Sequence, residues 1–235
     1  MEEQREHIVV IGAHAGDMEL TAGGVIAKYT MAGHRATLVH MTPGEKGHPR
    51  LSAEEYKRQK IAEGREVAEV LGAEVRFLPY KDAELAVDRE IQWKLCDVIR
   101  ELKPTVVITH WRNSIHPDHR NCHLNVVDGL FYAALREIRR ERPAHGVRRL
   151  FFAENWEDPE GFEPYVYVEV PSEAYERWVE AVRRYAFVRG ETSSFPYLDY
   201  YKALAVIRGA ESGFRYAESF MIPREGMRRC ERRLP

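Results

Sequence analysis

The sequence predicts a single α/β domain built on a doubly wound, mostly parallel sheet. Its 235 residues are enough for one such domain with a sizeable core. Short runs rich in Val and Ile alternate with longer helix-like segments through residue 110, and this βαβαβαβ order is typical of a parallel sheet with helices on its faces. No internal repeat or long linker interrupts residues 1–235, so we expect one Rossmann-like domain.

The elements of the first half are expected in strict alternation. Strands are predicted where β-branched residues cluster, and helices where apolar residues recur every three to four positions. Gly33 and Gly72 suit the ends of the first two helices, and Ser52 with Glu55 forms a capping box that begins the second. In chain order we expect a strand at 7–12, a helix at 18–31, a strand at 35–41, a helix at 52–71, a strand at 75–78, a helix at 88–102 and a strand at 105–109.

The second half continues with longer helices and fewer strands. From about Arg224 the chain is rich in arginine and predicts a flexible, solvated basic tail. In chain order we expect a helix at 119–141, strands at 150–153 and 165–170, and helices at 172–187 and 199–208.

Composition and charge exclude several kinds of partner. A formal charge of −2 and a pI near 6.6 give no reason to expect binding to nucleic acid or to an anionic membrane. No apolar run is long enough to span a bilayer. The scattered Cys96, Cys122 and Cys230 share no CxxC spacing, and the charged N-terminus does not resemble a signal peptide. We therefore expect reduced thiols and a cytoplasmic location.

Two short polar motifs follow the predicted strands 7–12 and 105–109. The first places His14 and Asp17 after strand one, and the second is the run His-Pro-Asp-His at 116–119. Strands one and four lie side by side in doubly wound sheets, where ligands bind at the carboxyl ends. Two His and one Asp around a divalent ion leave positions open for water and substrate, as in catalytic zinc sites. The sequence therefore predicts a metallohydrolase with its metal at the carboxyl ends of strands one and four.

Each motif also has an ordinary structural interpretation. Alone, His14 suits a surface loop, Asp17 the N-cap of a helix, and the run at 116–119 a turn. A nucleotide-binding domain is a further alternative, but the glycines after strand one lack the GxGxxG spacing and no acid ends strand two. The placement of both motifs at corresponding strand ends favours the metal site.

The two motifs resemble those of the PIG-L/LmbE family of zinc-dependent de-N-acetylases, which act on N-acetylglucosaminyl compounds. The first family motif reads Ala-His-Pro-Asp-Asp-Glu-(Glu)-Leu followed by Gly-Gly, and residues 13–20 with Gly23-Gly24 match it in degenerate form. The second, His-Pro-Asp-His, is intact at 116–119. Further matches at 42–45 and 216–220 extend the resemblance over nearly the whole chain.

The resemblance implies a role for each motif residue. His14, Asp17 and His119 would hold one Zn2+ per chain. His116 would act in catalysis, protonating the leaving amine or stabilising the tetrahedral oxyanion, and Asp118 would orient a histidine. The implied substrate is a small amino-sugar compound, whose acetamide is hydrolysed to acetate and a free amine. The oligomeric state is left open, with a homo-oligomer as one option.

The sequence departs from the family pattern at positions where the resemblance implies contact with substrate or water. Lys60 and Ser114 stand where relatives have an arginine for substrate recognition and a tyrosine. Gly16 replaces the family's general base, which typically contributes about 10²–10⁴-fold. Three outcomes remain open: another carboxylate, with Asp118 and Glu19 nearest in sequence, replaces it; the enzyme is slow or cleaves another bond; or the protein is a non-catalytic metal- or sugar-binding relative.

Overall fold

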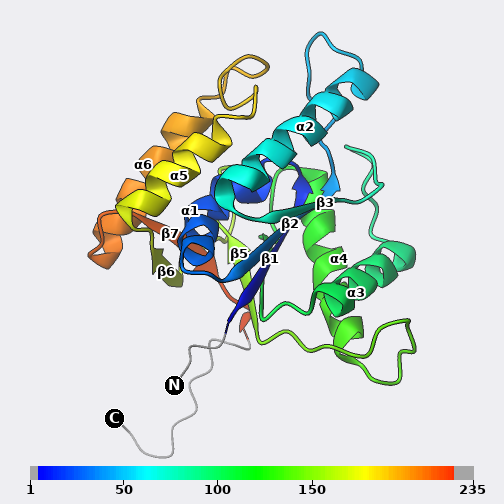
Figure 1. Ribbon diagram of the computed structural model, residues 1–235. Coiled ribbons are helices and arrows are strands. Elements are labelled where there is room, and N and C mark those ends of the chain that lie inside the picture. Colours follow the sequence, from blue (N-terminus) through cyan, green and yellow to red (C-terminus); the bar gives the residue numbers. More distant parts are fainter. Residues whose placement is uncertain (1–4, 225–235) are drawn as a thin grey trace, which may run out of the picture.

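The computed structural model describes residues 5–224 and contains a seven-stranded sheet with helices on both faces (Figure 1). The strand order is β3-β2-β1-β4-β5-β7-β6, and among these strands β7 alone runs opposite in direction, so that it pairs antiparallel with both β5 and β6. The predicted α/β class with a mostly parallel sheet is thereby confirmed. The strands are β1 (His7–His14), β2 (Arg35–Thr42), β3 (Glu74–Phe77), β4 (Val106–His110), β5 (Arg149–Ala153), β6 (Val166–Glu169) and β7 (Ala217–Met221).

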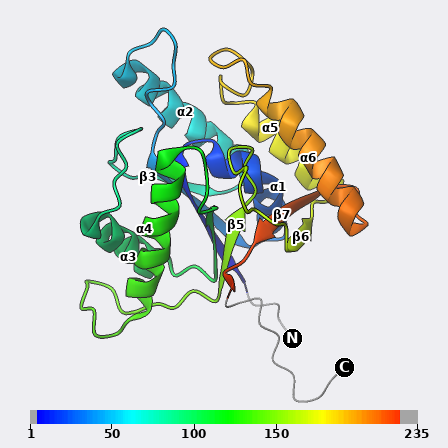
Figure 2. The same ribbon diagram turned by 180° about the vertical axis from the view of Figure 1, so that it is seen from behind.

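The helices divide between the two faces of the sheet, as Figure 2 shows from behind. One apolar core lies under α1, α2, α5 and α6, and a second lies under α3 and α4. Alternate residues of β1 serve the two cores, with Ile8 and Val10 on one side and Val9 and Ile11 on the other. The helices are α1 (Asp17–Met31), α2 (Ala53–Leu71), α3 (Arg89–Leu102), α4 (Pro117–Ala134), α5 (Ser172–Val182) and α6 (Tyr197–Ser212).

The two strands that carry the motifs are neighbours. β1 pairs with β4 in parallel, from Ile8 opposite Val106 to Ile11 opposite Thr109. Both strands are buried along their whole length. Their carboxyl ends therefore open at the same edge, next to the amino ends of α1 and α4.

Two predicted helices are shorter than expected. The helix expected at 119–141 ends at Ala134, because the fully buried Arg100 binds the backbone that follows. Its guanidinium donates to the carbonyl oxygens of Tyr132, Ala133, Leu135, Ile138 and Arg142. The helix expected at 172–187 ends at Val182, after which Arg189 donates to the carbonyl oxygens of two turn residues. An arginine thus binds the backbone at both helix ends: Arg100 from more than thirty residues earlier in the chain, and Arg189 from five to six residues later than the carbonyls that it binds.

The strand β7 was not predicted, although its residues belong to the segment at 216–220 that resembles the family. Its Glu218 carboxylate accepts hydrogen bonds from the backbone N–H groups of Gly24 and Val25 at 2.7 and 2.8 Å. A Cβ atom on Gly24 would lie 2.9 Å from Glu218 Oε1, so the glycine permits this approach. These two hydrogen bonds connect β7 to α1.

Several predictions fall at the limits of the described residues. The expected basic tail lies, apart from Arg224, outside residues 5–224, and so does Cys230. Cys96 and Cys122 are free and buried. No helix in the described part of the chain is long and apolar enough to cross a membrane.

Candidate active site

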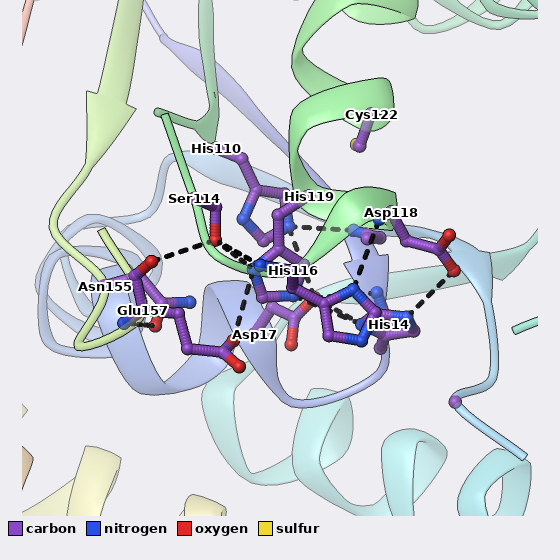
Figure 3. Close-up of polar contacts among 12 residues, drawn as sticks. His14, Asp17, His110, Ser114, His116, Asp118, His119, Cys122, Asn155 and Glu157 are labelled. Atoms are coloured by element: carbon purple, nitrogen blue, oxygen red, sulfur yellow. Dashed lines mark hydrogen bonds and ion pairs between the residues drawn. The ribbon is translucent and has the colours of Figure 1, made fainter. Parts of the chain in front are cut away.

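The carboxyl ends of β1 and β4 bring the two sequence motifs together. His14 is the last residue of β1 and Asp17 the first of α1, while His116 is the N-cap of α4 and His119 lies in its first turn. These four side chains point toward one another (Figure 3). Ring nitrogens of His14, His116 and His119 lie within 4.8 Å of one another. They form a candidate metal site beside β1 and β4, where the sequence predicts one.

Three donor atoms form a nearly equilateral triangle. The Nδ1 atom of His14 lies 3.2 Å from Asp17 Oδ2 and 3.3 Å from His119 Nε2, and the last two are 3.3 Å apart. Ligands of a tetrahedral zinc ion, each about 2.0–2.1 Å from the metal, are separated by about 3.3 Å. The spacing and the chemistry of this donor set fit a divalent ion such as Zn2+.

The outer nitrogen of His14 faces two carboxylates. Its Nε2 atom lies 3.1 Å from Asp82 Oδ1 and 3.3 Å from Asp118 Oδ2. A carboxylate only accepts hydrogen bonds, so Nε2 would keep its proton when an ion is held, and Nδ1 would then offer its lone pair to the ion. Asp118 is itself held by the backbone N–H groups of Ala83 and Leu85. This arrangement, in which carboxylates orient a ligand histidine, is common at metal sites. The donors of His14, Asp82 and Asp118 also lie within 4.8 Å of one another.

The outer nitrogen of His119 is held in a similar way. Its Nδ1 atom lies 3.2 Å from Ser114 Oγ and 3.3 Å from Glu157 Oε2. A proton on Nδ1 can be donated to the Glu157 carboxylate, which leaves the lone pair of Nε2 for the metal. On the other face, the His119 ring stacks on His110 with centroids 4.0 Å apart. Contacts with side chains from three other segments thus fix the orientation of His119.

His116 has a different arrangement from the other two histidines. Its Nδ1 atom accepts a hydrogen bond from the backbone N–H of Asp118 at 3.2 Å and so caps α4. The neutral ring must therefore carry its proton on Nε2. The ring packs edge-on against His14 and stacks with His119, with centroid distances of 4.7 and 4.8 Å. His116 thus belongs to the candidate cluster, but its Nδ1 atom is occupied and its Nε2 atom carries the proton.

The electrostatics of the site favour a bound cation. Burial acts to lower the pKa of His14, but the carboxylates of Asp17 and Asp118 outweigh it and raise that pKa well above its ordinary value. Burial acts to raise the pKa of Asp17, yet His119 and His14 hold it well below its usual range. Burial, together with His110, lowers the pKa of His119 to about 3. A buried, ionised carboxylate surrounded by further acids attracts positive charge, as a divalent cation requires.

A pocket of about 300 Å3 opens over these residues. Five aromatic side chains and several polar ones form its walls, while His14, Asp17, His116 and His119 also line it. Most small-molecule sites combine apolar walls with a few placed polar groups in this way. The wall residues are Tyr56, Trp156, Phe187, Tyr197 and Tyr201, with Lys60, Asp82, Asn155, Glu157, Thr192 and Ser193.

The two residues expected to bind substrate lie in different places. Lys60 lines the pocket, where its Nζ atom donates to the carbonyl oxygen of Ala15. Ser114 is buried behind His119, and its hydroxyl oxygen accepts a hydrogen bond from the backbone N–H of His116 at 3.3 Å. The geometry therefore places Lys60 at the pocket surface and Ser114 among the groups that support the histidines.

The backbone at Gly16 makes the sharp turn that joins β1 to α1. Gly16 has φ +109°, a conformation that residues with a Cβ atom rarely adopt. Its N–H donates to Glu19 Oε2 at 3.1 Å, so Glu19 is used to close this turn. A Cβ atom on Gly16 would meet the Phe187 ring, with 2.5 Å to Cζ. In the described part of the chain, the Phe187 ring thus occupies the space that a side chain at position 16 would need.

Asp82 and Glu157 were missed by reasoning from sequence. Asp82 comes from the loop after β3 and Glu157 from the loop after β5. Burial and the charge of Asp17 raise the pKa of Glu157 to about 7. The loop of Glu157 is held by Tyr201, whose hydroxyl donates to Asn155 Oδ1 at 3.2 Å. The position of Glu157 in the sequence could have indicated its role. The residue follows β5, the strand next to β4, and therefore lies at the same edge of the sheet.

Known proteins with similar sequence or structure include deacetylases and a hydratase. A diacetylchitobiose deacetylase of Thermococcus kodakarensis is 26% identical over 222 residues, covering 90% of this chain and 80% of that protein. A 4-oxalmesaconate hydratase of Pseudomonas putida is 28% identical over 117 residues, covering 47% of this chain and 45% of that protein. The crystal structure of the conserved protein TT1542 from Thermus thermophilus has a TM-score of 0.82 at 28% identity, covering 93% of this chain and 94% of that one.

A sequence model of the PIG-L family, described as GlcNAc-PI de-N-acetylase, matches residues 9–129. The matched stretch is just over half of the chain and contains both motifs of the site. The chain belongs to the PIG-L family.

Proposed function

We propose that this protein is a zinc-dependent amidohydrolase that removes the acetyl group from an acetamido-sugar compound. The observation that carries the proposal is the triangle of His14 Nδ1, Asp17 Oδ2 and His119 Nε2, with sides of 3.2 to 3.3 Å. Membership of the PIG-L family and the similarity to a diacetylchitobiose deacetylase support the same reaction. The aromatic walls of the pocket suit the apolar face of a sugar ring.

His14, Asp17 and His119 would hold the ion in this proposal. A bound zinc ion supplies Lewis acidity toward a carbonyl oxygen and lowers the pKa of water toward about 7. Asp82 and Asp118 keep the proton of His14 on Nε2. Ser114 and Glu157 hold the Nδ1 side of His119, so we assign Ser114 to positioning and not to substrate contact.

His116 would stabilise the oxygen on which negative charge develops when water attacks the acyl carbon. Its Nδ1 atom is already occupied by the Asp118 N–H, so its Nε2–H is the group that faces the reaction. A fixed donor of this kind is worth about 10²–10³ in turnover at comparable oxyanion sites. The neutral, hydrogen-bonded ring suits this role better than transfer of a proton to the amine.

The proton of the attacking water needs an acceptor other than residue 16. Glu19 is fully buried and accepts from Gly16 N–H and the Tyr185 hydroxyl, and Asp118 is committed to two backbone N–H groups. Glu157, by contrast, lines the pocket. We assign the general base to Glu157, which would take the water proton and deliver it to the nitrogen as the C–N bond breaks. Acetate and a free amine result.

The direct test is acetate release by purified protein loaded with one equivalent of Zn2+. Diacetylchitobiose and N-acetylglucosamine are the first substrates, and the chelated protein is the matched blank. Release that requires metal and is lost in the His116→Ala variant supports the proposal. Metal-loaded, folded protein that releases no acetate from a panel of N-acetylated sugars excludes it.

A second candidate reaction is addition of water to a carbon–carbon double bond. The specific observation in its favour is Gly16, because the carboxylate used for amide hydrolysis by relatives is absent there and Phe187 fills the space. The sequence similarity to a 4-oxalmesaconate hydratase points the same way. Loss of ultraviolet absorbance from a conjugated unsaturated acid, without acetate release from acetamides, would select this reaction. Tight metal binding with neither activity would indicate a non-catalytic metal-binding protein.

A further inference from the structure

The outward side of α4, the side turned away from the sheet, carries a stripe of apolar side chains. Leu124, Phe131 and Leu135 are 48, 62 and 38% exposed, and Pro117 at the start of the helix is exposed as well. Pro117, Leu124 and Phe131 are spaced by seven residues, which is about two helical turns, so they lie on one side of the helix. α4 lies outside the sheet beside α3 (Figure 2), and on its opposite side Val126 packs into the core.

Charged side chains are scarce on this helix. Apart from its histidines, α4 contains three ionisable residues that are charged at neutral pH, namely Asp118, Arg120 and Asp128. Asp118 is buried against His14, so the outward side keeps one positive and one negative group. The exposed positions of α2, by contrast, are mostly Glu, Lys and Arg. A helix side that faces water ordinarily has that second composition, and an exposed apolar stripe instead suits contact with another protein surface.

The two outward charges have no oppositely charged partner in the part of the chain that the structure describes. Arg120 Nη1 donates to the carbonyl oxygens of Ser114 and Ile115, which uses one of the three guanidinium nitrogens. Asp128 Oδ2 accepts a hydrogen bond from Gln92 Nε2 at 2.9 Å. Both charged side chains are partly exposed. Each can therefore pair with an opposite charge from outside this chain.

The outward residues of α4 are arranged symmetrically about Leu124. Arg120 and Asp128 each lie four residues from it, about one helical turn, and Pro117 and Phe131 each lie about two turns from it. In two antiparallel copies of α4 related by a twofold axis at Leu124, Arg120 of one copy comes level with Asp128 of the other. Pro117 and Phe131 come level in the same way. Opposite charges and apolar groups thus meet in one self-complementary interface.

We propose that the outward side of α4 binds a second copy of this chain, with the two helices packed antiparallel about a twofold axis at Leu124. Phe131 of the second copy then lies beside Pro117, in the turn of α4 that also carries His119. The helix that supplies His116 and His119 is thereby covered on its outer side by the other copy. The inference does not depend on which bond the enzyme breaks. A monomer in solution, and an assembly through another surface, are the competing outcomes.

Sedimentation velocity over a range of protein concentrations measures the assembly directly. The wild-type chain should sediment as a dimer, or as a larger assembly with an even number of chains, at micromolar concentration. Leu124→Glu brings two carboxylates together on the axis and should raise the dissociation constant of the contact by about a hundredfold or more. Ile207→Glu is the matched control, because Ile207 is an apolar residue of α6 that is 51% exposed, and it should leave the constant unchanged. Circular dichroism checks that each variant is folded.

Charge exchange tests the register of the two helices. Asp128→Arg alone and Arg120→Asp alone should each weaken the contact, because like charges then face each other on both sides of the axis. An equimolar mixture of the two variants should form a heterodimer, since one chain carries two basic residues at these positions and the other two acidic ones. Native mass spectrometry identifies the heterodimer by its mass. If Arg120→Asp does not fold, the weakening in Asp128→Arg tests the same contact.

Three results would overturn the inference. The first is a wild-type chain that stays monomeric, or forms only odd-numbered assemblies, at every concentration up to its solubility, which needs no variant. The second is an assembly that survives Leu124→Glu or that dissociates in Ile207→Glu. The third is a folded pair of charge variants that does not associate on mixing, because the antiparallel arrangement requires Arg120 and Asp128 to meet.

Discussion

A Cβ atom placed on Gly16 would lie 2.5 Å from the Cζ atom of Phe187. The phenyl ring therefore occupies the space beside Asp17 in which the family pattern has its general base. Position 16 also has φ +109°, which favours glycine. The packing of the pocket wall thus leaves no room for a carboxylate at position 16. We therefore expect that a substitution of Gly16 alone does not restore the general base.

Gly16→Asp should destabilise the protein and should not raise activity. Strain at positive φ costs about 1 kcal/mol or more, and the clash with Phe187 adds to it. Gly33→Asp is the matched control, because Gly33 also has positive φ, at +84°, but a Cβ there meets nothing within 4 Å. Urea denaturation of both variants measures the difference. Equal stability of the two would show that Phe187 moves aside freely, and Gly16→Asp with Phe187→Ala would then be the variant to assay.

His119→Ala should abolish stoichiometric zinc binding while the fold survives. Its Nε2 atom forms one corner of the donor triangle, and two donors hold zinc much more weakly than three. Metal analysis after dialysis gives the stoichiometry, and circular dichroism checks the fold. His123→Ala is a suitable control, since that histidine is buried nearby and its Nδ1 atom contacts the His110 carbonyl oxygen at 2.8 Å. Unchanged zinc content in His119→Ala would reject the ligand set.

His116→Ala should keep the metal and lose most turnover. The ring is fixed by the Asp118 N–H on one nitrogen, and we place the other as a donor to the reacting oxygen. A fall of about 10²–10³-fold in kcat is expected from loss of such a donor. Zinc titration and acetate release on the same preparation separate the two effects. If zinc content falls as far as in His119→Ala, His116 is a ligand and the roles must be exchanged.

Most of the architecture was predictable because it depends on local patterns. The strands and helices through residue 110 are marked in the sequence by the spacing of apolar residues and by residues typical of helix ends. One example is the capping box of Ser52 and Glu55, which the structure contains. The meeting of His14 with His119 follows from topology alone, since doubly wound sheets place strands one and four together. Long-range side-chain contacts that do not follow from the strand order were not predictable. The end of α4 depends on Arg100, some thirty residues earlier in the chain, which no local pattern reveals.

The part of the site that sequence did not reveal comes from loops. Asp82 and Glu157 reach the histidines from the segments after β3 and β5. Side-chain direction in such loops depends on tertiary contacts, here the hydrogen bond from Tyr201 to Asn155. Asp118 and Glu19 were the sequence candidates for the base, but Asp118 accepts from two backbone N–H groups and Glu19 closes the turn at Gly16.

Glu218 should make stability depend on pH. Burial outweighs its two backbone hydrogen bonds and raises the pKa of Glu218 to about 7. The native state then holds a proton that the unfolded chain, with an ordinary Glu pKa of about 4.3, releases earlier, so the free energy of unfolding falls as pH rises between these values. Because the side chain is partly exposed, the effect is on the order of 1–2 kcal/mol.

Comparison with Glu218→Gln isolates this contribution. The difference in unfolding free energy between wild type and variant should shrink as pH rises from about 4.5 to about 7.5, because only the wild type loses stability by ionising at this site. Glu176→Gln, which changes an exposed acid in α5, is the control for the loss of one carboxylate. A wild-type advantage that grows with pH would mean that the Glu218 carboxylate is stabilised when ionised.

Glu157→Gln should lower turnover without removing the metal. The amide oxygen of Gln can still accept a hydrogen bond from His119 Nδ1, so the ring stays oriented. An amide does not take a proton at neutral pH, so loss of the base should reduce kcat by about 10²–10⁴-fold. Glu157→Ala removes both functions and should also weaken zinc binding by about 10–100-fold, as loss of a supporting hydrogen bond does at other metal sites.

The contrast between these two variants decides what Glu157 does. Glu160→Gln, which changes an exposed acid three residues further on, is the control for the charge change and should leave both properties unchanged. If Glu157→Gln turns over at the wild-type rate while Glu157→Ala loses zinc, the residue only positions His119, and the base must be sought elsewhere in the pocket. Asp82 would then be the next carboxylate to test, because it lines the same pocket and already contacts His14 at 3.1 Å.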